Sequence, residues 1–298
     1  MVRQYKIHTN LDGTDDKVWD VTNGKVRFYQ PSNLGLQSTN NIWQSNGIGV
    51  MGTRSITQPQ IEFKLETFGE SLEENYQLMK DFINDILNQK FVTLEYQTEI
   101  FQVYADLSLA EVTKTEGYGK NGTFSEKITF DIITKWYTYE NLTFEKIQNG
   151  QVLSGKSKIY GGTAPGSYKY VEGTSYTYYG ESDIDRLSRW DIKDEIFSFM
   201  GILYPQLPKT PTGVRFLDDI GNEYTAIVFK TEQLQNYILI NTDVNDEIYQ
   251  GWNGTTPLNL FPVMDFERYR TRIIEKGQME LINLAKAEFK IKRKADFI

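Results

Sequence analysis

Residues 71–89 read SLEENYQLMKDFINDILNQ, and this stretch carries the clearest periodic pattern in the chain. Its large apolar side chains recur every three or four residues, which is the spacing of one face of an α-helix. They are Leu72, Tyr76, Met79, Phe82, Ile83, Ile86 and Leu87. Ser71 and Glu74 have the spacing of a capping box, so the pattern predicts a helix over 71–89 that packs this stripe against a sheet.

The residues before this helix favour β-strands. Apolar and polar side chains alternate around Val26 and Phe28 and again over 61–65, as they do in half-buried strands. Asn23-Gly24 predicts a hairpin turn between residues 18–21 and the strand that follows. The polar, Gly-rich stretch up to about residue 59 is interpreted as a long ordered loop or a projecting hairpin.

Strands also follow the helix, at residues 91–96, 101–109 and 124–132, with a Gly-rich tip at 117–122. Strands with a single helix predict an α+β sandwich or split barrel over residues 1–136. Residues 191–298 show short strands separated by turns and no helical pattern, which predicts a β-sandwich or jelly roll in a second domain over 137–298. The whole chain is therefore expected to be mainly β with one clear helix.

Residues 146–190 differ in composition from both domains, because glycines recur and large aliphatic side chains are sparse. Such a segment has too little apolar surface for a core of its own, so we expect an arm that projects or lies over another surface. Tyrosine offers a large contact area with few rotatable bonds, as in binding loops. The candidate partner-binding residues are Tyr160, Tyr168, Tyr170, Tyr176, Tyr178, Tyr179 and Trp190, the last of which could equally anchor the domain core.

Composition excludes several classes of function. The formal net charge of −8 argues against binding to nucleic acid, which requires clustered Lys and Arg. The chain has no cysteine, so disulfides, thiolate metal sites and cysteine nucleophiles are ruled out. Residues 1–20 lack an apolar signal core, and no window approaches the ~18 apolar residues of a membrane span. We expect a soluble protein, made in the cytoplasm, that does not insert into membranes.

Catalytic and metal-binding patterns are weak. His8 is the single histidine, and one near a first strand is more often a surface or packing residue than a catalytic one. The adjacent carboxylates are better explained by turns and helix capping than by catalysis; they are Asp15/Asp16, Glu73/Glu74, Asp183/Asp185 and Asp218/Asp219. Asp243 opens a stretch with the first oxygen ligands of a calcium loop, but Ile248 and Gly254 replace the Gly and Glu that such a loop requires. No catalytic residue, metal or cofactor is expected.

The order of these features resembles the distal tail proteins of siphophages that infect Gram-positive bacteria, over nearly the whole chain. The resemblance rests on an early Asp-Gly turn, the Pro31–Leu36 segment, strands leading to Phe63 and Phe68, the single helix and the long hairpin after it. In the second half it rests on Tyr237–Asn241, Asp265-Phe266-Glu267 and Lys276-Gly277. The lactococcal type within the family, which carries an arm-like insertion where this chain has residues 146–190, is the most similar.

The resemblance implies a structural hub in the baseplate at the distal end of the phage tail. The N-terminal domain would form a homohexameric ring that continues the tail tube and contacts the tail-tip protein. The C-terminal domain would be a galectin-like β-sandwich whose arm holds trimers of the receptor-binding protein. Such a protein is not an enzyme, and it enters the virion after synthesis in the host cytoplasm.

Two other functions stay open from the residues alone. The C-terminal domain could be a carbohydrate-binding module that uses exposed aromatic side chains such as Trp252. A galectin-like fold does not by itself imply sugar binding. A hydrolase with carboxylates brought together by the fold is the third possibility, since such pairs leave no local signature.

Overall fold

The computed structural model describes residues 3–13, 15–35, 37–57, 60–114, 125–145, 147–148, 151–152, 190–233, 235–244 and 246–295. In these ranges the chain is mainly β with one α-helix, which confirms the predicted fold class. It divides into two compact units. The N-terminal unit comprises the residues up to Thr138 together with Ala295, and the C-terminal unit runs from Tyr139 to Lys294. The boundary proposed from the sequence, between 136 and 137, lies two residues from this division.

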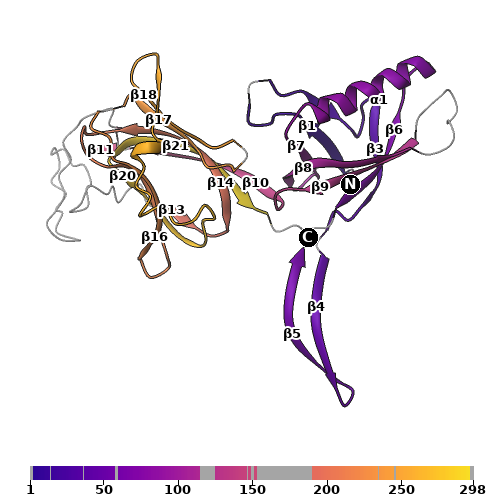
Figure 1. The fold of residues 1–298 in the computed structure, drawn as a ribbon, viewed down its shortest axis with the longest axis horizontal. Coiled ribbons are helices and arrows are strands. Elements are labelled where there is room, and N and C mark those ends of the chain that lie inside the picture. Colours follow the sequence, from indigo (N-terminus) through magenta and orange to yellow (C-terminus); the bar gives the residue numbers. More distant parts are fainter. Residues whose placement is uncertain are drawn as a thin grey trace. The chain divides into compact units, whose positions relative to one another are not determined.

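The N-terminal unit contains an antiparallel sheet with the strand order β2–β1–β7–β8–β9–β6–β3 (Figure 1). Its strands are β1 (Gln4–His8), β2 (Val18–Asp20), β3 (Val26–Ser32), β6 (Ile61–Thr67), β7 (Val92–Gln97), β8 (Gln102–Thr113) and β9 (Ser125–Ile132). A single backbone hydrogen bond from Phe28 N–H to Val21 O, of 2.7 Å, links the two ends of this order. The sheet therefore curls toward closure, as a split barrel does.

The hairpin predicted at Asn23-Gly24 is wrong. Strand β2 forms its ladder with β1, and β3 forms its ladder with β6, so the two strands on either side of this turn share only the bond from Phe28 to Val21 and no ladder of their own. The side chain of Asp20 explains the turn, because its Oδ1 accepts hydrogen bonds from the amides of Thr22 and Asn23. Local Asx chemistry forms the turn without requiring the strands to pair.

Helix α1 spans Leu72–Leu87 and confirms the predicted helix. Ser71 caps its first turn by accepting from the Glu74 amide at 3.1 Å, and Glu74 accepts in return from the Glu70 amide. The helix lies beside β3 and β6 in Figure 1 and buries Phe82 and Ile86 in the core of the N-terminal unit.

The buried stripe of α1 is narrower than predicted. Leu72, Tyr76 and Leu87 are exposed, whereas Asn75 is fully buried. The Asn75 side chain accepts from the Gly69 amide and donates to the Ser71 carbonyl, so it serves the turn that leads into the helix. A polar residue thus occupies a core position because its hydrogen bonds are satisfied there.

The C-terminal unit is a sandwich of two antiparallel sheets, as predicted. The larger sheet has the order β19–β18–β17–β14–β21–β10, and the smaller has the order β13–β20–β15–β16. The strands are β10 (Tyr137–Glu145), β13 (Trp190–Ile192), β14 (Ile196–Pro205), β15 (Thr212–Leu217), β16 (Glu223–Phe229), β17 (Tyr237–Asn241), β18 (Ile248–Trp252), β19 (Pro257–Asn259), β20 (Gly277–Ile282) and β21 (Leu284–Lys294). A 3-10 helix, η3 (Phe261–Val263), follows β19, and a short pair, β11 (Ile147–Gln148) and β12 (Gln151–Val152), follows β10.

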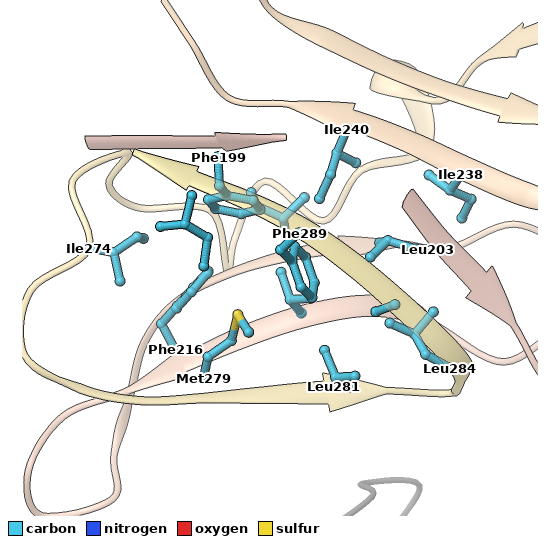
Figure 2. Packing of buried hydrophobic residues seen from close by; sticks show 14 of the residues in the cluster. Phe199, Leu203, Phe216, Ile238, Ile240, Ile274, Met279, Leu281, Leu284 and Phe289 are labelled. Carbon is cyan, nitrogen blue, oxygen red and sulfur yellow. The ribbon is translucent and has the colours of Figure 1, made fainter. Parts of the chain in front are cut away.

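Side chains from both sheets fill the core of this sandwich. Figure 2 shows Phe199 and Phe289 of the larger sheet beside Phe216 and Met279 of the smaller one. Phe289 belongs to an alternation along β21, in which Ala287, Phe289 and Ile291 point inward. On the other face of β21, Lys292 is buried, and its Nζ lies 3.0 Å from Asp243 Oδ2.

Candidate functional site

Two strands of the N-terminal unit pair only with each other among the described residues. They are β4 (Gln37–Ser45) and β5 (Ile48–Thr57), which form a separate antiparallel hairpin. Figure 1 shows them as two long arrows. The sequence left this stretch open between a loop and a hairpin; it is a hairpin.

The turn of this hairpin follows from Asn46-Gly47. Both residues have positive φ angles, 51° for Asn46 and 79° for Gly47, as both central residues of a type I′ turn do. Asparagine and glycine are the residues that adopt this conformation at low cost. The turn places Ser45 opposite Ile48 and Trp43 opposite Val50.

The hairpin exposes large apolar side chains on both of its faces. Trp43 is 69% exposed and Val50 60%, and as a directly opposed pair they share one face with Ile48, which is 70% exposed. Ile42 and Met51 form the opposed pair on the other face and are 54% and 51% exposed. An isolated two-stranded hairpin is only marginally stable in water. We therefore identify this hairpin, residues 37–57, as the candidate interaction site.

The arm residues predicted from the sequence fall largely outside the described residues. Tyr160, Tyr168, Tyr170, Tyr176, Tyr178 and Tyr179 all lie there. Trp190 is described: it is the first residue of β13, it stands opposite Met279 in β20, and it packs against the core of the sandwich. Of the two roles considered for Trp190, the structure supports the core anchor.

His8 is a buried structural residue. Its Nδ1 lies 2.6 Å from Asp16 Oδ2, and its Nε2 lies 2.8 Å from Glu95 Oε2. Both ring nitrogens are thus engaged by carboxylates, which leaves neither to serve as a base for a nucleophile. The second oxygen of Glu95 accepts from Lys6 Nζ and Gln102 Nε2. The arrangement holds β1, β7 and β8 together and performs no evident chemistry.

The charge of Glu95 is stabilised by these neighbours. Burial alone would raise the pKa of its carboxyl, but the hydrogen bonds from His8, Lys6 and Gln102 outweigh burial and hold the pKa below its usual range. Burial raises the pKa of the nearby Tyr104 hydroxyl to about 12, with a smaller contribution from the Glu95 charge. Glu95 is therefore an ionised structural group rather than a general acid at neutral pH.

The carboxylates of the candidate calcium loop are engaged by other side chains. Asp243 pairs with Lys292, Asp246 accepts from the Asn241 amide at 3.2 Å, and Glu247 pairs with Arg272. Asn245 lies outside the described residues. Within the described ranges, no group of three or more His, Asp or Glu side chains is arranged to hold a metal ion, and no helix there is long and apolar enough to cross a membrane.

Trp252 is not an exposed aromatic platform. It ends β18, is half-buried, and stacks on Tyr237 with ring centres 5.8 Å apart and an interplanar angle of 17°. Its Nε1 is buried. The saccharide-binding hypothesis stays a prediction, which a glycan array with the full chain would test, and this geometry gives it less support than the hairpin gives to assembly.

Two family models together match nearly the whole chain. The model described as the distal tail protein N-terminal domain matches residues 4–133, and the model described as the Dit C-terminal domain matches residues 135–298. The distal tail proteins of Lactococcus phages p2 and SK1 are 92% and 90% identical over the full length of both chains.

Solved structures give the same result. A chain of the phage p2 baseplate, in its activated conformation with Ca, matches with a TM-score of 0.79 at 92% identity and full coverage of both chains. The same baseplate with Sr matches equally. The Dit protein of SPP1 matches with a TM-score of 0.53 at 10% identity, again over both full chains, which supports the fold alone.

Proposed function

The chain belongs to the distal tail protein family of bacteriophages, and from this premise we propose that it is a homohexameric hub ring of the baseplate. In this proposal the N-terminal units form the ring, which continues the tail tube on one side and meets the tail-tip protein on the other. The C-terminal units hold trimers of the receptor-binding protein through the arm over residues 146–190. The protein works as a structural component of the virion, not as an enzyme.

The observation that carries the proposal is the exposed apolar hairpin. Monomeric proteins seldom expose contiguous apolar surface of this kind, and such a surface usually marks an interface. Trp43 is the side chain in it that we expect to contribute most, because tryptophans are enriched among residues that dominate binding energy. The free backbone edges of a two-stranded ribbon also favour further pairing.

A ring follows when this surface meets a different surface on an identical neighbour. Such a head-to-tail contact either closes into a ring or continues as a filament, depending on the rotation between copies. Six arms on one ring would also turn a modest contact with each receptor-binding protein into strong overall attachment. One head-to-tail contact, repeated between identical copies, is therefore sufficient to build the ring.

Light scattering after size-exclusion chromatography tests the ring. We expect the purified chain, alone or with its tail partners, to elute at the mass of a hexamer. Replacing Trp43 and Val50 together by serine should shift the mass toward the monomer. The matched control replaces Gln37 and Gln44, also by serine. Both are exposed polar residues of the same hairpin, so the mass should stay unchanged. A strict monomer at high concentration under every condition would refute the proposal.

A further inference from the structure

A head-to-tail ring needs a second surface on each subunit that receives the hairpin of the next one. The N-terminal unit exposes another apolar surface, at the start of α1. It consists of Tyr29, Phe68, Leu72 and Tyr76, and we call it the α1 patch. Leu72 is 53% exposed and Tyr76 63%, although the sequence predicted both as core residues.

The members of the α1 patch form two close pairs on neighbouring segments. Leu72 and Tyr76 are four residues apart, so they are neighbours on one side of the helix. The rings of Tyr29 and Phe68 lie 6.3 Å apart. Lys25 connects the two pairs, because its carbonyl accepts from the Phe68 amide and its Nζ binds Glu74 in the first turn of α1.

The two surfaces carry opposite charges at one side of the contact, although Arg27 also lies over the Phe68 ring of the α1 patch. Arg54 is the single charged residue of the hairpin 37–57, and it is exposed. Glu70 and Glu73, also exposed, flank the α1 patch at the N-terminal end of the helix. Opposite charges at the rim of an apolar contact favour one orientation of docking over others.

The hairpin is also long enough to reach a neighbour. Strand β4 has nine residues. At ~3.3 Å per residue such a strand spans about 30 Å, comparable to the diameter of a small domain. Its tip face, with Trp43, Ile48 and Val50, can therefore lie on the surface of a second molecule while its base remains within the first.

We propose that the α1 patch is the docking site for the hairpin of a second copy of this chain. Trp43 and Val50 pack against Leu72 and Tyr76 of the neighbour, and Arg54 lies toward the acidic start of its helix. This assignment rests on the proposed ring and names the surface through which the ring closes. It also explains why the start of α1 carries the exposed apolar side chains of Leu72 and Tyr76.

Cross-linking between introduced cysteines tests this contact, because the native chain has no cysteine. One variant carries Ser45→Cys, which lies on the same face of the hairpin as Trp43, together with Gln77→Cys, an exposed residue next to Tyr76. The matched control combines Ser45→Cys with Gln89→Cys, which is also exposed but lies past the far end of α1, which ends at Leu87, ~15 Å from Gln77 at the helical rise. A short bismaleimide is applied to the full-length protein, and light scattering on the untreated samples confirms the assembled state.

We expect the Ser45→Cys/Gln77→Cys protein to give a ladder of covalent oligomers up to the closed ring, and the control to stay monomeric on a denaturing gel. If the first variant assembles into rings by light scattering but gives no covalent oligomers, the α1 patch is not the acceptor of the hairpin. The ring proposal would then remain intact. Cross-links that appear only to an added tail tube or tail-tip protein would overturn it as well, in favour of that partner. An unassembled chain would refute both proposals together.

Discussion

At the scale of single residues, the N-terminal unit depends on buried polar groups that satisfy one another. His8 is a clear case, since its two nitrogens join Asp16 and Glu95. The sequence predicted a surface or packing residue without chemistry, and it could not identify the partners. Glu95 is 87 residues away in the sequence, and no local sequence pattern predicts a contact between residues so far apart.

Glu95→Gln should reduce the sensitivity of the protein to acid. A carboxyl whose pKa is lowered by folding stabilises the native state fully above its unfolded pKa of about 4.5, and this stabilisation is lost as the pH falls through the folded value. The wild type should therefore lose stability below about pH 4.5, and the variant should lose less over the same interval. Urea unfolding followed by tryptophan fluorescence at neutral and acidic pH measures this.

The control for this comparison is Glu73→Gln, an exposed carboxylate in the first turn of α1. It removes one negative charge without touching the contacts of Glu95 with His8, Lys6 and Gln102, so it controls for the change in net charge. If Glu95→Gln and the wild type lost equal stability between the two pH values, the ionised Glu95 would not be a source of acid sensitivity.

At the scale of the elements, the periodicity of apolar residues predicted the elements that pack on a core. It did not predict the hairpin 37–57, which has no core beneath it. Helix α1 was predicted because the spacing of apolar residues such as Phe82 and Ile86 matches their burial. The hairpin 37–57 stayed undecided because neither of its faces packs on a core of its own, so no alternation is imposed on it. Asn46-Gly47 was the signal for it, yet the same dipeptide at 23–24 marks a turn between strands that do not pair.

Asn75→Ala should destabilise the N-terminal unit by about 1–3 kcal/mol, the cost of leaving buried polar groups without partners. The substitution removes the acceptor of the Gly69 amide and a donor to the Ser71 carbonyl. Chemical denaturation measures the change in the free energy of unfolding. Gln77→Ala is the control on the same helix, because Gln77 is exposed and should change stability by less than about 0.5 kcal/mol.

A valine in place of Gly47 tests the turn of the hairpin. The φ of 79° at this position is strained for a β-branched residue, so the hairpin should lose order. Since no neighbouring atom lies within 4 Å of a Cβ built there, a steric clash is not the cause. We expect a lower ring mass by light scattering and little change in the unfolding of the N-terminal unit; an unchanged ring mass would show that assembly does not depend on this turn.

At the scale of the whole molecule, the two units suit two tasks in the proposed hub. The N-terminal unit carries both surfaces of the proposed ring contact, and the C-terminal unit carries the segment that we propose as an arm. The fold class and the family were within reach of the sequence because an ordered set of strands, one helix and turns covers nearly its full length. The surfaces proposed for the ring contact could not be predicted from the sequence, because the exposure of a side chain depends on packing between segments that are distant in the chain.

Deletion of residues 150–185 should abolish capture of the receptor-binding protein and leave the ring intact. The reason is that the proposed gripping residues are removed, whereas the hairpin and the α1 patch are untouched. Co-purification with the receptor-binding protein, combined with light scattering of the variant alone, separates the two effects. Undiminished capture would refute the arm assignment, and loss of the ring would show that the segment also supports assembly.

The return of the last described residue to the N-terminal unit has a mechanical consequence. Ala295 N–H donates to Trp136 O at 2.8 Å, so the backbone crosses between the units at Thr138/Tyr139 and again at Lys294/Ala295. A pull on the C-terminal unit would load the covalent connection at Thr138/Tyr139 and, in parallel, the non-covalent contact that holds Ala295. A protease cut at Thr138/Tyr139 would break the covalent link to residues 1–138, and the C-terminal unit would then be held to them only by non-covalent contacts such as this hydrogen bond.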